Sequence, residues 1–295
     1  LHDIFLLEEG DSWQSGWAVG ENGTVVSTSD GGDSWTVMTS GTTETLNGVY
    51  FLDMSTGYTW GTNNTYLITI DGGANWVEQV APNKISSEDT DTISDIAFDD
   101  TGEPLYAVGG AEGKDRIWEY DGSTWDQIST SEPDTDTLLT KISVNVEGTD
   151  WYVVGEDDDN SGDGTPSWRK PNNASWDSIN VSYSVFGNNY CVGFTVLQNV
   201  WVAGENGIFY SYNLGLDWNH QYQETEIRDI RMLDMSGTPI GWAVGREGVI
   251  LKYDTQWNHQ ETQSSDLYGV HLINDSDGAI VGANGLILIT NDGGD

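Results

Sequence analysis

The chain has 295 residues and a formal charge of −38 at pH 7, because 48 acidic residues stand against 10 basic ones. A negative field of this size repels nucleic acid and anionic membrane surfaces, so neither is expected as a partner. The 36 glycines and 14 tryptophans, beside only 6 prolines, favour short aromatic strands joined by tight turns, and no apolar run approaches the ~20 residues that cross a bilayer.

The acidic residues are spread along the whole chain and are not gathered in one tail. Like charges repel over a Debye length of about 30 Å at 0.01 M salt but only about 3 Å at 1 M, so salt favours the folding of such a chain. Lysine is scarce, although a soluble surface normally mixes both signs. The sequence therefore predicts a halophilic protein, with an ordinary acidic secreted protein as the alternative.

A short apolar strand that closes on a glycine recurs along the chain and marks a repeat. Its copies include GWAVG at residues 16–20, YTWG at 58–61 and YVVG at 152–155. The closing glycines lie 37 to 49 residues apart, which is close to the ~40–50 residues of a four-stranded propeller blade. They are Gly20, Gly61, Gly109, Gly155, Gly204, Gly245 and Gly282.

Each unit divides into four predicted strands. In the first unit these are residues 3–7, the GWAVG run, residues 24–28 and a fourth strand that Trp35 opens. Equivalent first strands are predicted at residues 48–52, 94–98, 141–146, 229–233 and 269–273, with a less certain one near Cys191 in the fifth unit. Further fourth strands are predicted to start at Trp76, Trp125, Trp176, Trp218 and Trp257. No segment shows sustained helical periodicity.

These units predict one all-β domain over residues 1–295, a seven-bladed β-propeller of four-stranded antiparallel blades. The last blade is expected to lack its outer strand, so we expect Ser or Thr followed by Trp to come next in the full-length polypeptide. The predicted blades cover residues 1–40, 41–81, 82–130, 131–180, 181–221, 222–261 and 262–295.

The stretch TSDGGDSW at residues 28–35 returns as TIDGGANW at 69–76, SYNLGLDW at 211–218 and TNDGGD at 290–295. Its aspartate can accept hydrogen bonds from its own turn, its glycine can take a positive φ, and its tryptophan can cover the blade edge. We therefore predict a structural and not a catalytic role for Asp30, Trp35, Asp71, Trp76, Trp218 and Asp292.

These turns resemble the Asp-box, or BNR, repeat. Together with residues 16–35, they make the chain similar to the photosystem II assembly and stability factor group of seven-bladed propellers, which are WD40- and YVTN-like in architecture. The resemblance covers nearly the whole chain and implies the fold. It does not imply one function, because Asp boxes also occur in sialidases and sortilin-like receptors.

A sialidase-like glycoside hydrolase is the enzyme alternative. Such an enzyme would be expected to need three arginines for the substrate carboxylate, a tyrosine nucleophile and an acid. The arginines of this chain fall only in the third, fourth and sixth units, so no catalytic residue is predicted. They are Arg116, Arg169, Arg228, Arg231 and Arg246.

An acidic insertion at residues 155–168 offers the one cofactor possibility. Asp159, Ser161 and Asp163 have the alternate-residue oxygen spacing that opens calcium loops. Lys170 stands where a bidentate glutamate should close such a loop, which excludes a full EF-hand loop. A calcium site and a solvated acidic loop both stay open, and no other cofactor is expected.

The position just before each first strand gives a candidate binding site. Aligning the units places His2, Asn47, Ser94, Thr140, Arg228 and Tyr268 in one ring where the chain enters each blade near the axis. Loops from every blade converge on such a rim, and its residues are polar and varied, although loops are often polar without binding anything.

The sequence therefore predicts a rigid, non-catalytic binding or scaffold propeller. We expect it to be extracellular, on a cell surface or on a virion, within a larger polypeptide or assembly, and to recognise a protein or glycan through its rim. A purely structural spacer is a further alternative.

Overall fold

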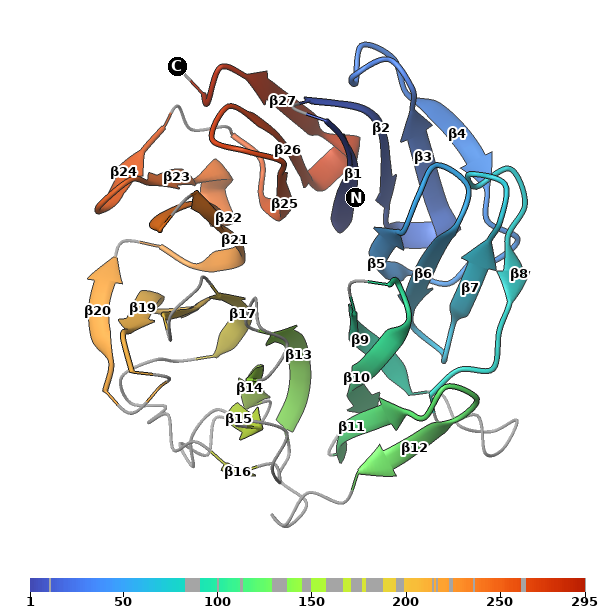
Figure 1. The fold of residues 1–295 in the computed structure, drawn as a ribbon, viewed down its shortest axis with the longest axis horizontal. Helices are drawn as coiled ribbons and strands as arrows, with labels where there is room; N and C mark the ends of the chain where they lie inside the picture. The colour runs from blue at the N-terminus through green and yellow to red at the C-terminus, as the bar shows by residue number, and fades with distance from the viewer. Residues whose placement is uncertain are drawn as a thin grey trace.

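The protein is an all-β propeller of small antiparallel sheets arranged radially around a central opening, as its computed structural model shows (Figure 1). The predicted fold class is confirmed at this level. Among the described residues, no helix is long and apolar enough to span a membrane. The structure describes residues 1–10, 12–82, 91–99, 101–111, 114–128, 137–144, 150–157, 167–170, 177–178, 188–194, 199–213, 215, 217–222, 225–235, 237–260 and 264–294.

The described strands form seven sheets, six with four strands and one with three. The first sheet contains β1 (Asp3–Glu9), β2 (Ser12–Val19), β3 (Thr24–Thr28) and β4 (Thr36–Thr39), and the second contains β5 (Leu46–Phe51), β6 (Gly57–Gly61), β7 (Tyr66–Thr69) and β8 (Val77–Glu78). The third contains β9 (Thr92–Phe98), β10 (Pro104–Ala111), β11 (Lys114–Tyr120) and β12 (Trp125–Ile128). The fourth contains β13 (Thr137–Val144), β14 (Trp151–Asp157), β15 (Ser167–Lys170) and β16 (Asp177–Ser178).

The remaining three sheets follow in chain order. The fifth sheet contains β17 (Asn189–Phe194), β18 (Val200–Gly204), β19 (Gly207–Ser211) and β20 (Asn219–Tyr222). The sixth contains β21 (Ile227–Met235), β22 (Thr238–Gly245), β23 (Ile250–Tyr253) and β24 (Trp257–His259). The seventh contains β25 (Leu267–Leu272), β26 (Asp277–Gly282) and β27 (Ile287–Asn291).

Each sheet is a meander of consecutive antiparallel strands. Figure 1 shows the first strand of each sheet, from β1 to β25, beside the central opening, and strands such as β4, β12 and β20 at the periphery. The outer strands begin at the predicted tryptophans or directly after them. β12 and β24 begin at the predicted tryptophan, whereas β4, β8 and β20 begin one residue after it.

Tight turns of one design join the second and third strands of three sheets. Each contains a residue in the left-handed region followed by glycine: Asn22 has φ 56°, Glu247 has φ 59° and Asn284 has φ 58°. Asparagine is one of the residues that enter this region most readily, which explains the recurring Asn-Gly pair.

A close approach of two backbones requires the closing glycine of the second strand at positions 20, 61, 109, 245 and 282. A Cβ on Gly61 would lie 1.9 Å from the carbonyl oxygen of Thr45, and one on Gly245 would lie 2.1 Å from that of Glu226. Both distances are far inside van der Waals contact. The glycine that defines the repeat period is therefore a packing requirement where the second strand meets the start of the first.

The apolar core lies between neighbouring sheets. Trp17, Val19 and Val25 of the first sheet pack against Val49 and Phe51 of the second, and the rings of Trp17 and Phe51 stack with centroids 3.5 Å apart. Burial of such surfaces between sheets is the main source of stability in the propeller.

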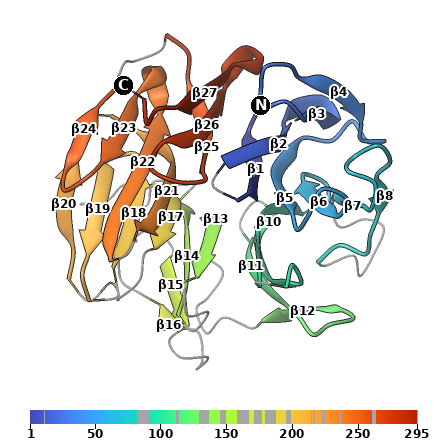
Figure 2. The same ribbon diagram turned by 45° about the horizontal axis from the view of Figure 1, so that its top comes forward.

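The last sheet packs against the first. Ile4 and Leu6 of β1 share a buried cluster with Ala279 and Val281 of β26, and the Leu1 nitrogen donates to the Gly282 carbonyl oxygen at 3.2 Å. Figure 2 shows β25 to β27 beside β1 and β2 from a second direction. Contacts between the two ends of the sequence thus close the described arrangement.

Candidate functional site: the axial rim and channel

The six residues predicted to form a rim all line one hollow of about 610 Å³. The structure thus brings together side chains from sheets that are far apart in the sequence. Thr62, Thr92, Leu138, Tyr190 and Glu226 complete the lining.

A β-bulge places every rim side chain that is the extra residue of a first strand, whereas His2 precedes β1. In β21 the register passes from Ile227 to Asp229 opposite consecutive residues of β22, which leaves Arg228 as the extra residue. The same irregularity occurs in five other first strands, at Asn47, Ser94, Thr140, Tyr190 and Tyr268. Bulges re-aim side chains, and in three of these strands a rim residue is followed directly by a channel residue. The pairs are Ser94 and Asp95, Thr140 and Lys141, and Arg228 and Asp229.

An arginine and two rings form the most structured part of the rim. The Arg228 guanidinium carbon lies 4.9 Å from the centroid of the Tyr268 ring, within cation–π range. The His2 ring is 5.8 Å from Tyr268, centroid to centroid, at an angle of 60°. These side chains come from β21, from β25 and from the residue before β1, so they bridge three sheets.

Acidic side chains hold Arg228 in position. Its Nε donates to Glu226 Oε1 at 2.8 Å, and its Nη1 lies 3.2 Å from Asp266 Oδ2. Burial disfavours the charged guanidinium, but the hydrogen bond and charge of Glu226, with Asp266 and Tyr268, raise the pKa of Arg228 above its usual value. The rim therefore presents a fixed, fully charged arginine within acidic surroundings.

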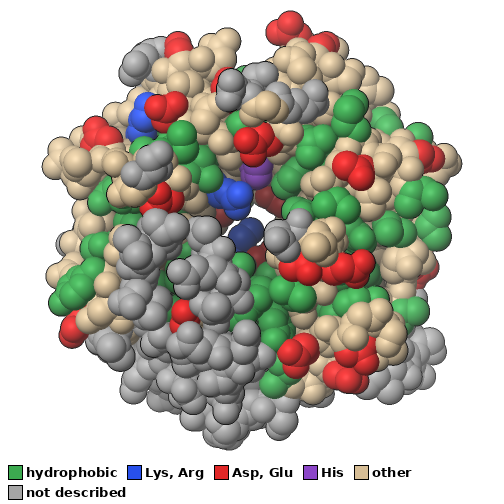
Figure 3. All heavy atoms as spheres, viewed as in Figure 1, with side chains coloured by type: hydrophobic (Ala, Val, Ile, Leu, Met, Phe, Trp, Pro, Cys, Tyr) green, Lys and Arg blue, Asp and Glu red, His purple; other side chains and the backbone are tan. Residues whose placement is uncertain are grey.

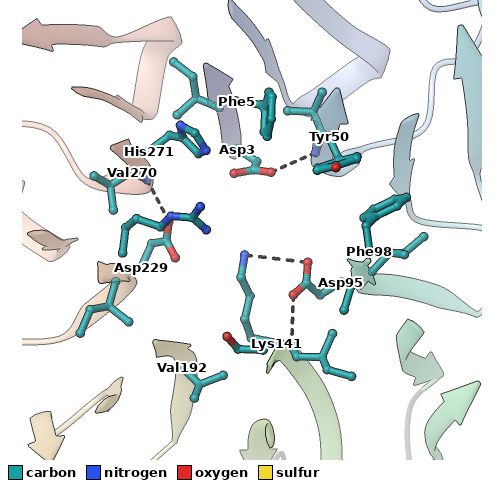
Figure 4. A pocket seen from close by; sticks show the side chains of 18 of the residues that line it. Asp3, Phe5, Tyr50, Asp95, Phe98, Lys141, Val192, Asp229, Val270 and His271 are labelled. Atoms are coloured by element: carbon teal, nitrogen blue, oxygen red, sulfur yellow. Dashed lines mark hydrogen bonds and ion pairs between the residues drawn. The ribbon is translucent and has the colours of Figure 1, made fainter. Parts of the chain in front are cut away.

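A polar channel of about 290 Å³ lies along the axis next to the rim (Figure 4). Three aspartates in it each bond to the backbone of the next first strand. Val49 N donates to Asp3 Oδ2 at 2.9 Å, Ile142 N to Asp95 Oδ2 at 3.1 Å, and Val270 N to Asp229 Oδ2 at 2.9 Å. These bonds link neighbouring first strands, which do not pair with one another as a sheet.

Basic groups share the channel with these carboxylates. Figure 3 shows basic side chains and a histidine at the central opening, with acidic side chains spread over the surrounding face. Lys141 Nζ lies 3.9 Å from Asp95 Oδ1. Burial disfavours its charge, but Asp95, Asp229 and Asp3 together raise the pKa of Lys141.

Burial and the nearby Arg231 lower the pKa of His271 well below its usual value, so the ring is neutral. Its Nδ1 accepts a bond from Leu6 N at 3.4 Å, which places the ring proton on Nε2. Phe5, Tyr50 and Phe98 continue from His271 as an aromatic wall (Figure 4). The Phe5 ring lies 4.8 Å from the His271 ring, and the rings of Tyr50 and Phe98 stack at 4.3 Å, centroid to centroid.

The aspartates of the recurring turn bond within their own turns. Asp30 Oδ1 accepts from the Thr28 hydroxyl at 2.7 Å and from Ser34 N at 3.0 Å. The Ser34 hydroxyl and these other donors lower the pKa of Asp30 to about 2. Asp71 bonds in the same way to Thr69 and Asn75, and Asp292 accepts from the hydroxyl of Thr290 and the nitrogen of Gly294.

The tryptophans of these turns lie against the cores between sheets. Trp35 packs on the cluster between the first and last sheets, Trp76 on that between the first and second, and Trp218 on that between the fourth and fifth. These tryptophans therefore help to hold neighbouring sheets together.

The arginines considered for catalysis occupy several places. Arg116 pairs with Asp91 at 2.8 Å, Arg228 lies on the rim, and Arg231 lines the channel. Arg246 lies 3.9 Å from Glu226. The calcium prediction at Asp159, Ser161 and Asp163 falls outside the described residues, and no group of metal-ligating side chains is found within the described part of the chain.

Sequence reasoning missed Tyr190 and the channel residues. Tyr190 is the rim residue of the fifth sheet. Its position in the sequence could have identified it, because Tyr190 stands directly before Cys191 as Arg228 stands directly before Asp229 in the sixth sheet. Lys141 directly follows the rim residue Thr140, and Arg231 comes three residues after the rim residue Arg228. The sequence pattern nevertheless identifies both only as strand residues.

The fold and this axial site define a propeller of small antiparallel sheets. No family model matches the sequence, and no curated protein gives a significant match. Solved propellers match nearly the whole chain in structure. YCF48 from Cyanidioschyzon merolae has a TM-score of 0.68 at 18% identity and covers 99% of this chain and 95% of that one.

YCF48 bound to D1 peptide has a TM-score of 0.68 at 20% identity, covering 98% of this chain and 92% of that one. The WD40 propeller domain of Doa1 has the same TM-score at 12% identity, covering 98% and 91%. At these identities the likeness is one of fold, and it makes this chain a propeller that resembles the YCF48 group.

Proposed function

We propose that the seven sheets are the blades of one closed, non-catalytic propeller, which binds an extended segment of a partner protein at the axial rim. The observation that carries this proposal is the convergence of six bulged first strands and His2 on one hollow of about 610 Å³. Rigid sheets hold the hollow open, which lowers the entropy lost on binding. One of the similar propellers supports a protein ligand, because it is bound to D1 peptide.

The chemistry of the rim favours a basic partner segment. Tyr268, Tyr190 and His2 offer ring surfaces, while Glu226, Asp266 and Glu21 surround them with negative charge. The whole-molecule charge of −38 attracts a cationic segment from a distance, and complementary charge mainly raises the association rate. The same charge supports our proposal that the protein works outside the cell or at a surface in saline water.

The test begins with a displayed random-peptide library and a glycan array, both screened against the intact chain. We expect basic peptides to be enriched. Their affinity should fall about tenfold or more in Tyr268→Ala, which removes the central ring surface. It should rise in Arg228→Ala, which removes a like charge and leaves Glu226 and Asp266 free to attract the basic peptide. Arg246→Ala is the matched control, since Arg246 is 59% exposed and does not line the hollow.

Equal peptide affinity in all three variants would place binding elsewhere on the propeller. Glycan hits lost in Arg228→Ala without any peptide hits would assign the rim to sugars. A panel of fluorogenic glycosides should show no turnover, and turnover would favour the hydrolase alternative.

A further inference from the structure

Two layers of side chains face the axis inside the channel of about 290 Å³. Residues two apart in a strand point to the same side, so the residues one and three positions after a rim residue face the axis together. The first layer holds Asp3, Asp95, Lys141 and Asp229, and the second holds Phe5, Tyr50, Ala97, Ser143, Arg231 and His271. The rim hollow shares no lining residue with either layer, so the channel is a separate candidate site.

The second layer offers hydrogen-bond donors without a partner in the described part of the chain. Arg231 is exposed inside the channel, and no hydrogen bond or ion pair joins its guanidinium to another described residue. The His271 ring makes one hydrogen bond to the described residues, accepted by Nδ1, so its Nε2 proton is left over. Arg231 is near enough to lower the pKa of His271 by its charge, so the two groups are neighbours. A guanidinium beside an N–H donor fits a carboxylate.

The first layer offers acceptors of the opposite charge. Asp3 and Asp229 each use Oδ2 to hold the next first strand, and neither Oδ1 accepts a hydrogen bond from a described residue. Both carboxylates act on Arg231 through their charge but lie beyond ion-pair distance from it. Asp95 differs, because the Lys141 ammonium lies 3.9 Å from its Oδ1. Two carboxylate oxygens are therefore available to an ammonium group.

Ring surface and open space accompany these charged groups. Figure 4 shows Phe5, Tyr50 and Phe98 along the channel, and the Phe5 ring lies 4.8 Å from that of His271. The second layer also contains the small side chain of Ala97, which takes up little of the channel. The volume of about 290 Å³ lies near the lower end of the ~300–1,000 Å³ range of ligand sites, so the ligand is small.

We propose that the channel binds a free α-amino acid with a large apolar side chain. Its carboxylate pairs with Arg231 and the His271 Nε2 proton. Its ammonium group pairs with Asp3 and Asp229, and its side chain packs on the aromatic wall. Such a zwitterion has no net charge, so the −38 charges of the protein do not repel it. An anion alone would meet the aspartates of the first layer, and a cation alone would meet Arg231 and Lys141.

The probe is L-phenylalanine, titrated into the intact chain in a calorimeter. Binding should be saturable, with one molecule per chain. Two analogues, 3-phenylpropanoate without the ammonium group and 2-phenylethylamine without the carboxylate, should each bind about tenfold or more weakly, because each leaves charged groups of the channel unpaired. Glycine, which lacks the ring, should also bind more weakly than L-phenylalanine.

Two variants test the two charged ends of the ligand separately. Arg231→Met should weaken L-phenylalanine binding about tenfold or more but not weaken 2-phenylethylamine, which has no carboxylate to lose contacts. Asp3→Asn should weaken L-phenylalanine binding but not that of 3-phenylpropanoate, which has no ammonium group. Arg246→Ala is the matched arginine control, since Arg246 is 59% exposed and lines neither hollow.

The proposal fails if L-phenylalanine shows no saturable binding below about 10 mM, or if it binds no more tightly than 3-phenylpropanoate. It also fails if Arg231→Met weakens every ligand equally, because that result would indicate general damage. Tyr268→Ala removes the ring of the rim and should leave L-phenylalanine binding unchanged. A loss in that variant would move the amino acid to the rim hollow and overturn the proposal as well.

Discussion

Asp3 differs from the surface aspartates because its carboxylate lies in the axial channel. Burial is the main cause that raises its pKa to about 6, with Asp229 and Asp95 adding to the shift and Lys141 and the Val49 hydrogen bond opposing it. Asp30 differs in the opposite sense, because hydrogen bonds from its own turn lower its pKa to about 2. The two carboxylates therefore couple stability to pH with opposite signs.

Between about pH 4 and pH 6 folded Asp3 keeps a proton that the unfolded chain has lost, so its contribution to stability falls as pH rises through this window. Asp3→Asn should therefore equal the parent below pH 4 and be more stable by about 3 kcal/mol at pH 7, in urea unfolding series. Asp30→Asn is the control with the opposite sign: it should lose stability at pH 7, and its deficit should shrink as pH falls towards 2. A pH-independent difference for Asp3→Asn would contradict this account.

The elements of this protein are held in place by short-range features that recur from sheet to sheet. Bulges turn the first strands so that rim and channel residues both face the axis, as with Arg228 and Asp229. Closing glycines let the second strand approach the start of the first. The axial site thus depends on backbone geometry repeated in each sheet more than on any single side chain.

Gly61→Ala tests this dependence, because the new Cβ would lie 1.9 Å from the Thr45 carbonyl oxygen and must displace backbone. We expect a loss of about 3 kcal/mol or more in the free energy of unfolding, measured by urea denaturation. Gly41→Ala is the control: Gly41 has φ 84°, and no heavy atom lies within 4 Å of the position that its new Cβ would take, so only backbone strain of about 1 kcal/mol is expected. Similar losses in both variants would show that the close approach is unimportant.

The whole molecule carries −38 charges on a surface whose acidic groups are spread around the face in view in Figure 3. Self-repulsion of this kind opposes the compact state, and salt weakens it by screening. Internal basic groups such as Lys141 balance the charge of acidic groups in the channel and not of those on the surface. Stability at the molecular scale should therefore depend on ionic strength.

The melting temperature should rise by several degrees between 0.1 M and 2 M NaCl, followed by circular dichroism, because the Debye length shrinks from about 10 Å to below about 3 Å. Sucrose is the control, since it favours burial without screening charge, and its effect should be smaller. An unchanged melting temperature in NaCl would remove the argument for a halophilic protein.

Much of the fold was predictable from local patterns. Gly61 and its counterparts gave the period, and residues such as Trp35 and Trp76 marked the outer strands, because turns and strand alternation are encoded within a few residues. The ring of His2, Asn47 and Arg228 could be predicted for the same reason: equivalent positions in repeated units must lie at equivalent places around an axis.

Only the tertiary structure decided which side chains meet at those equivalent positions. Bulges, invisible in the residue pattern, set Arg228 and Asp229 on the same side, brought Tyr190 into the rim and put Lys141 and Arg231 in one channel. Local conformation is determined by neighbouring residues in the sequence, whereas such sites arise from contacts between segments that are distant along the chain.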